Sequence, residues 1–215
     1  MVAPALAALV VVIRPEWAPA WWPQVAATRV IVSTVIALVA VLGFVVTMAL
    51  LTGRSLSWPP ADVGAPVAVF VAVQAFGTLC EELGWRGVVQ RVGEQLARPV
   101  VVSAIAGFLF GATHLGYWSL GVMPLLTFAI TAMLMSLTIT TIFTGGLWQR
   151  MLPAVVVHLG VNLGMGAIAD QGEPLATTPW ALGAAIVMLG IAIIGRTAAN
   201  RLRTRTRLWN VRGDV

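Results

Sequence analysis

The sequence predicts an all-α integral membrane protein, a polytopic transmembrane helical bundle of about seven membrane helices. Of its 215 residues, 59% are hydrophobic and only 10% are charged, whereas a typical soluble domain carries about 25% charged residues. A water-soluble fold could not cover its surface with so few charges. Several apolar runs also approach or exceed the roughly 20 residues that cross about 30 Å of hydrocarbon.

Seven apolar runs follow one another with short connections. They are Val2–Ile13, Val30–Leu51, Pro66–Val88, Val100–Tyr117, Val122–Phe143, Met151–Ile168 and Trp180–Gly195. The first run covers only about 20 Å as a helix. We expect a short or tilted helix there and not a cleaved signal, because its first charge, Arg14, follows the apolar stretch. The chain divides into N-terminal helices (1–65), a core (66–168), and a last helix with an arginine-rich tail (169–215).

The basic charge consists entirely of arginine, with thirteen Arg and no Lys and a formal net charge of +5. Most of these arginines flank apolar runs, where they orient a membrane protein. Nucleic-acid binding would need a basic face on a soluble domain, and the sequence contains none. Because positive charge favours the cytoplasmic side, we expect a multi-pass protein of the cell membrane with a cytoplasmic C-terminus and Arg54 outside. The tail arginines are Arg196, Arg201, Arg203, Arg205, Arg207 and Arg212.

Five ionisable residues lie inside the apolar runs, away from their ends. They are Glu81, Glu82, Arg86, His114 and His158, and the two histidines are the only ones in the chain. Each charge at the centre of a membrane helix costs about 2.5–3.5 kcal/mol on insertion scales. Such residues therefore mark a functional site by default.

Helical spacing groups these residues into three short clusters. Glu82 and Arg86 are four residues apart and so share a helix face, as do His158 and Asn162. Phe110 and His114 have the same spacing. At 1.5 Å per residue, Glu81 and His158 lie about 14–15 Å from the ends that we assign to the cytoplasm, whereas His114 comes out at about 22 Å. A tilt or a later start of the fourth helix would absorb that difference.

Each cluster also has a purely structural interpretation. Glu82 and Arg86 can form a buried pair that does no more than neutralise charge. His114 and Asn162 can be hydrogen-bonding links between helices, and Phe110 can be packing. The coincidence of the three clusters favours function, because together they supply carboxylates, two imidazoles and a carboxamide, the parts of a hydrolase that activates water.

The three clusters resemble the motifs of a known family. Residues 81–86 read EExxxR, residues 110–114 read FxxxH and residues 158–162 read HxxxN. In this order on separate membrane helices, they are similar to the CPBP family, which comprises the type II CAAX prenyl endopeptidases and bacterial relatives linked to bacteriocin processing and self-immunity. The resemblance covers roughly 66–168. The composition, rich in Ala, Val and Gly with Arg but no Lys, is typical of a GC-rich bacterial genome, and nothing in the sequence indicates a prenylated CAAX substrate.

The resemblance implies a role for each matching residue. Glu81 would activate water and His114 would help to hold it. His158 and Asn162 would stabilise the oxyanion, and Glu82 with Arg86 would support the site by charge pairing. Members of the family are often described as metalloproteases, and a metal-free glutamate mechanism has also been argued.

Whether a metal is needed stays open at this point. Glu81, His114 and His158 have the donor types of a catalytic zinc site with one open position. The sequence lacks the HExxH motif that combines two ligands and a base, and Asn162 on the face of His158 suits oxyanion donation better. The metal-free alternative is therefore slightly favoured.

We therefore expect an intramembrane endopeptidase that hydrolyses a membrane-associated or hydrophobic peptide or protein within the lipid bilayer. One alternative is a membrane immunity or regulatory protein that binds a peptide or partner protein without catalysis. Another is a transporter or proton relay, but the paired halves typical of many transporters are absent from the sequence.

Overall fold

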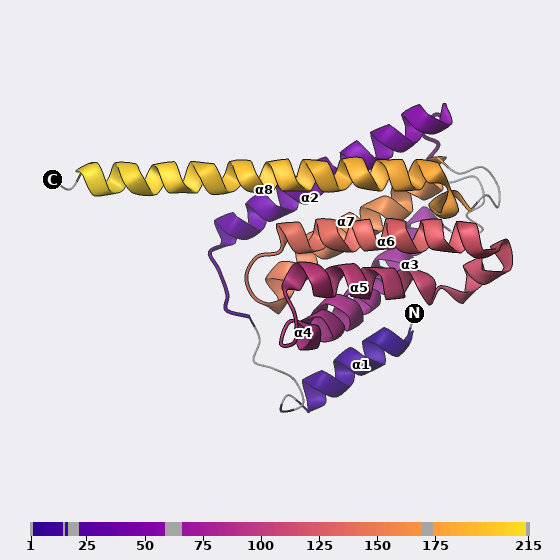
Figure 1. Cartoon of the computed structure of the whole chain (residues 1–215), viewed down its shortest axis with the longest axis horizontal. Helices are drawn as coiled ribbons and strands as arrows, with labels where there is room; N and C mark the ends of the chain where they lie inside the picture. Colours follow the sequence, from indigo (N-terminus) through magenta and orange to yellow (C-terminus); the bar gives the residue numbers. More distant parts are fainter. Residues whose placement is uncertain (1, 15, 17–21, 59–65, 169–173, 214–215) are drawn as a thin grey trace.

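A computed structural model of the chain describes residues 2–14, 16, 22–58, 66–168 and 174–213. These residues form a bundle of helices that run back and forth along one axis, with no strand in the described ranges (Figure 1). The predicted all-α fold is confirmed. Trp17 and Trp21, which lie between the first two apolar runs of the sequence, fall outside the described residues.

All seven predicted apolar helices form. The helices are α1 (Val2–Ile13), α2 (Ala27–Thr52), α3 (Val67–Glu82) with its continuation through η2 (Leu83–Val89) and α4 (Gln90–Gly93), α5 (Pro99–Ala112), α6 (Val122–Ile142), α7 (Leu147–Ile168) and α8 (Pro179–Gly213), with short η3 (Leu115–Leu120) and η4 (Leu175–Thr177).

Fewer of these helices are long enough to cross a membrane than the seven that the sequence predicts. Five described helices are long and apolar enough to cross a membrane: α2, α3 through α4, α6, α7 and α8. Helix α5 has 14 residues and α1 has 12, which correspond to about 21 and 18 Å at 1.5 Å per residue. Length and composition thus support five crossings, and two further apolar helices are short.

Helix α5 ends earlier than expected. The predicted run extended to Tyr117, but the helix stops at Ala112, and His114 has a non-helical backbone conformation. The hydroxyl of Thr113 donates to the carbonyl oxygens of Leu109 and Phe110. Together with the backbone N–H of Thr113, which also donates to Leu109, this hydroxyl satisfies carbonyl groups of the last turn, and the chain turns into η3.

The third apolar helix is not α-helical throughout. Directly after Glu82 it widens into a π-helix, Leu83–Val89, before the α-helical pattern resumes at Gln90. Segments of π-helix are rare and occur often at functional sites.

Glycines allow two pairs of helices to approach closely. A Cβ atom at Gly107 or Gly111 of α5 would collide with the backbone of α6, and one at Gly160 or Gly164 of α7 would collide with valine side chains of α2. Small residues of this kind allow two helix backbones to approach closely.

The start of α2, the end of α4 and the connection from α6 to α7 lie at one end of the bundle, on the left in Figure 1. The guanidinium of Arg150 lies 3.9 Å from the ring centroid of Trp22, and the Trp22 indole donates to Glu94 at 3.0 Å. Arg196 on α8 donates to the carbonyl of Phe143. Helix α8 extends past this end of the bundle, so the arginine-rich tail is helical up to Gly213 (Figure 1).

Candidate active site

The two adjacent glutamates at the end of α3 have different surroundings. Glu81 lines a pocket within the bundle, and its side chain is 9% exposed. Glu82 is completely buried behind it. Neighbouring residues of a helix project about 100° apart, so one carboxylate faces the pocket while the other faces the supporting helices.

Glu82 lies between a histidine and an arginine. Its Oε1 is 2.8 Å from Nδ1 of His158 on α7, and its Oε2 is 3.3 Å from Nε of Arg86. Arg86 is also completely buried, with its guanidinium 5.7 Å from the ring centroid of Phe110. Within the part of the chain that the structure describes, the Arg86 guanidinium makes no hydrogen bond, so its contact with Glu82 is mainly Coulombic.

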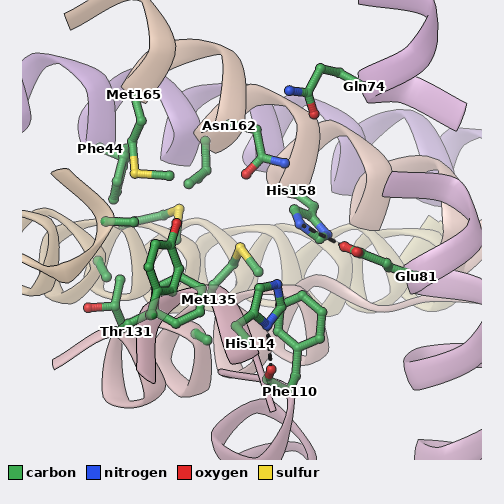
Figure 2. A pocket seen from close by; sticks show the side chains of 17 residues that line it. Phe44, Gln74, Glu81, Phe110, His114, Thr131, Met135, His158, Asn162 and Met165 are labelled. Carbon is green, nitrogen blue, oxygen red and sulfur yellow. Dashed lines mark hydrogen bonds and ion pairs between the residues drawn. The ribbon is translucent and has the colours of Figure 1, made fainter. Parts of the chain in front are cut away.

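His158 faces both glutamates. While Nδ1 contacts Glu82, Nε2 lies 3.6 Å from Oε2 of Glu81 (Figure 2). An ionised carboxylate only accepts hydrogen bonds, so Nδ1 donates to Glu82. This bond determines the orientation of the ring and leaves Nε2 directed toward Glu81 and the pocket.

His114 reaches the same pocket from the end of α5. Its Nδ1 is 2.7 Å from the carbonyl oxygen of Phe110, which only accepts, so Nδ1 carries a proton. The other ring nitrogen points into the pocket (Figure 2). The ring thus folds back by about one helical turn toward Phe110, which offsets the extra depth that the sequence implied.

Phe110 holds the two histidines in place. Its ring makes edge-to-face contacts with His114 (centroids 4.6 Å apart) and with His158 (5.7 Å). It makes a third such contact with Trp85 at 5.8 Å. Phe110 therefore packs, as its structural interpretation supposed, and the groups that it packs against are those of the site.

Asn162 lies one turn from His158 on α7 and lines the same pocket. Its carboxamide makes no hydrogen bond to any described residue, so it is free to bind a ligand. The structure thus places Glu81, His114, His158 and Asn162 around one pocket, with Glu82 and Arg86 behind it.

Three polar pocket residues did not stand out in the sequence: Gln74, Tyr117 and Thr131. Gln74 lies two turns before Glu81 on α3, and Tyr117 is in η3. The rings of Tyr117 and His114 are nearly parallel, with centroids 6.3 Å apart. Burial raises the pKa of the Tyr117 phenol, so the phenol stays protonated and can donate. The available signals were its spacing of three residues from His114 and its being the only tyrosine.

The residues of the site do not fit a metal ion. Among the described residues, no three His, Cys, Asp or Glu side chains converge closely enough to hold one. Nδ1 of His114 contacts the Phe110 carbonyl and Nδ1 of His158 contacts Glu82, arrangements that metal-binding histidines also have. The zinc set that the sequence allowed, Glu81 with both histidines, is not assembled in this geometry.

Comparison with known proteins agrees with the motifs. Residues 63–164 match the model of a family described as type II CAAX prenyl endopeptidase Rce1-like. A search of curated proteins finds no match to the chain. The matched segment contains all six predicted site residues, while α2 and α8 lie outside it. The resemblance stated from the sequence is thereby confirmed, and the chain is a multi-pass membrane protein.

Proposed function

We propose that this chain, whose residues 63–164 belong to the Rce1-like type II CAAX prenyl endopeptidase family, is an intramembrane endopeptidase. Its substrate would be a hydrophobic or membrane-associated peptide, and water activated by Glu81 would cleave it. The observation that carries the proposal is the pair of contacts made by His158, whose two ring nitrogens face Glu82 and Glu81.

Charge balance supports a role for Glu81 as the base. The charge of Arg86 offsets that of Glu82. With Glu81 ionised and His158 neutral, the cluster of these four residues has a net charge of −1, and one further proton makes it neutral. When that proton is on Nε2 of His158, Glu81 is an ionised carboxylate able to accept a proton from water. In the same state the imidazole carries an N–H at both nitrogens, and Nε2–H becomes a donor toward the pocket.

The reaction would then proceed in two proton-balanced steps. Glu81 takes a proton from a water molecule placed between its carboxylate and the pocket-facing nitrogen of His114, while the water oxygen bonds to the carbonyl carbon of the peptide. Glu81 next returns that proton to the amide nitrogen as the carbon–nitrogen bond breaks. The products are a carboxylic acid and an amine, and Glu81 is again ionised.

The developing oxyanion needs donors that are already in place. Nε2–H of His158 and the amide N–H of Asn162 project from one face of α7 into the pocket. The phenol of Tyr117, kept protonated by burial, is a third candidate. Removal of one such donor typically lowers kcat by about 10²–10³.

The metal-free mechanism is part of this proposal. It rests on the geometry of the described residues, among which no three His, Cys, Asp or Glu side chains converge closely enough to hold a metal ion. Glu81 is therefore assigned as base and not as ligand.

The test compares membranes from cells that produce the wild type, Glu81→Gln or Cys80→Ser. Gln keeps the shape of Glu81 but cannot take a proton, and Cys80 is the preceding residue with a thiol that could otherwise act as nucleophile. We expect mass spectrometry to detect released peptides with the wild type and with Cys80→Ser, and not with Glu81→Gln. Equal peptide profiles for all three would reject proteolysis and favour the immunity or regulatory alternative, in which binding does not need the carboxylate.

A further inference from the structure

The pocket has two chemically different ends. The polar end contains Glu81, His114, His158 and Asn162, all within the segment that matches the family. The other end is mainly apolar, with Thr131 as a polar lining residue (Figure 2), and part of its wall comes from α2 and α8, outside that segment. The residues of the polar end therefore lie in the family segment, whereas part of the lining of the apolar end comes from other parts of this chain.

The apolar end forms a recess, which we define by Phe44 of α2, Met135 of α6, Met165 of α7, and Ala185 and Met188 of α8. Phe44, Ala185 and Met188 are completely buried, and Met135 is 6% exposed. Figure 2 shows Phe44, Met135 and Met165 across the pocket from Glu81. The recess is thus lined largely by buried residues, across the pocket from the proposed reacting groups.

The size of the pocket limits what can enter. The cavity measures about 290 Å³ in total, at the lower end of the roughly 300–1,000 Å³ of small-molecule sites. This space must hold a peptide bond and a water molecule at the polar end. The space that remains for the recess is on the scale of one amino-acid side chain.

We propose that the recess binds one large apolar side chain, such as Leu, Met or Phe, next to the bond that is cleaved, and that α2 and α8 determine its size. This inference rests on the proposed endopeptidase function and adds the substrate class. The three methionines suit this role because flexible, polarisable thioethers adapt to differently shaped apolar groups. Ala185 leaves the space that a larger residue on α8 would fill.

Physical reasons favour a large apolar side chain over small or polar ones. A Gly or Ala in this position would leave the recess empty, and an apolar void loses packing contacts. A polar side chain would lose its hydrogen bonds to water without replacement. Differences of one methylene group in such pockets change specificity by about 10–200-fold.

Two variants alter the recess in opposite directions. Ala185→Leu fills it, and Met188→Ala enlarges it. Met48→Ala is the matched control, because Met48 is also completely buried on α2 but does not line the pocket. Any general effect of truncating a buried methionine should appear in both alanine variants, whereas a change in specificity should appear only in Met188→Ala.

The experiment uses purified full-length protein in detergent micelles and a synthetic library of nonapeptides. One position is fixed as Gly, Ala, Leu, Phe or Trp, and the others are randomised over Ala, Val, Ser and Leu. Mass spectrometry identifies the cleaved bonds for the wild type, Ala185→Leu, Met188→Ala and Met48→Ala. In parallel, the Glu81→Gln background, alone and with each recess variant, is used to identify the peptides that co-elute with the protein.

We expect the wild type to select Leu or Phe over Gly and Ala by about tenfold or more beside the cleaved bond. Met188→Ala should shift selection toward Trp, Ala185→Leu should shift it toward Gly and Ala, and Met48→Ala should leave it unchanged. Cleavage with the same preference in all four proteins would overturn the proposal that the recess selects the side chain, while the proposed endopeptidase function would stand. Size-selective co-elution without cleavage would support the proposed role of the recess and overturn the endopeptidase function. If neither cleavage nor selective co-elution is observed, both proposals are overturned.

Discussion

Nδ1 of His158 and Oε1 of Glu82 lie 2.8 Å apart and join α7 to α3 inside the bundle. The two residues are 76 positions apart in the sequence, so this hydrogen bond exists only because the two helices pack against each other. The bond orients the imidazole so that Nε2 faces Glu81 and the pocket. Glu82 is therefore a positioning residue in the proposed mechanism.

Glu82→Gln should lower kcat by roughly 10²–10⁴ and leave KM nearly unchanged. A glutamine amide can donate to Nδ1 and so favour the wrong tautomer, and losses of this size follow when the carboxylate that orients a catalytic histidine is replaced. Steady-state kinetics on a cleaved library peptide measures the effect. A large rise in KM at constant kcat would place Glu82 in substrate binding.

Arg86→Ala should lower both folded yield and activity. Removing one member of a buried ion pair costs about 3–5 kcal/mol, because the other charge is left without compensation, and Glu82 is completely buried. Thermal unfolding in detergent and the amount of monodisperse protein measure this effect. Arg98→Ala is the control, since Arg98 is exposed before α5. Equal stability of both variants would mean that the Arg86–Glu82 pair contributes nothing measurable.

Tyr117→Phe should keep the fold and lower kcat by about 10²–10³, the typical effect of one oxyanion donor. The ring and its contacts with His114 and Phe128 are retained, so only the phenolic hydroxyl is lost. A kcat equal to that of the wild type would restrict the oxyanion donors to His158 and Asn162.

Activity should survive exhaustive chelation, and the purified protein should contain no stoichiometric metal. This expectation follows from the absence of three converging ligand side chains among the described residues. Elemental analysis together with peptide cleavage before and after chelation provides the measurement. Stoichiometric zinc, with activity lost on chelation and restored by zinc, would make Glu81 a ligand and contradict the metal-free mechanism.

A reporter fused after Val215 should be active only in its cytoplasmic form. Arg91, Arg150 and Arg196 lie toward the end of the bundle beyond which α8 continues, and positive charge favours the cytoplasmic side. A second reporter after Arg54, near the opposite end, should behave in the opposite way. Activity of the C-terminal reporter outside the cytoplasm would reverse the proposed orientation.

The sequence by itself determined the helical class, the position of each apolar helix and the residues to examine. These properties depend on local features: long apolar runs predict membrane helices, and a spacing of four residues predicts a shared helix face. The buried charges also stood out without a structure, because ionisable residues are rare at membrane depth. Whether α1 and α5 cross the membrane could not be predicted from their apolar character.

Only the tertiary structure decided how the selected residues meet. The sequence paired Glu82 with Arg86 on one helix, but the contact of Glu82 with His158 depends on the rotation of α3 against α7. The early end of α5 and the folded-back ring of His114 bring that histidine to the level of Glu81. Gln74, Tyr117 and the recess formed with α2 and α8 likewise belong to the pocket only through packing between distant segments. Helix periodicity describes each helix about its own axis, whereas depth, rotation and mutual approach depend on contacts with the other helices.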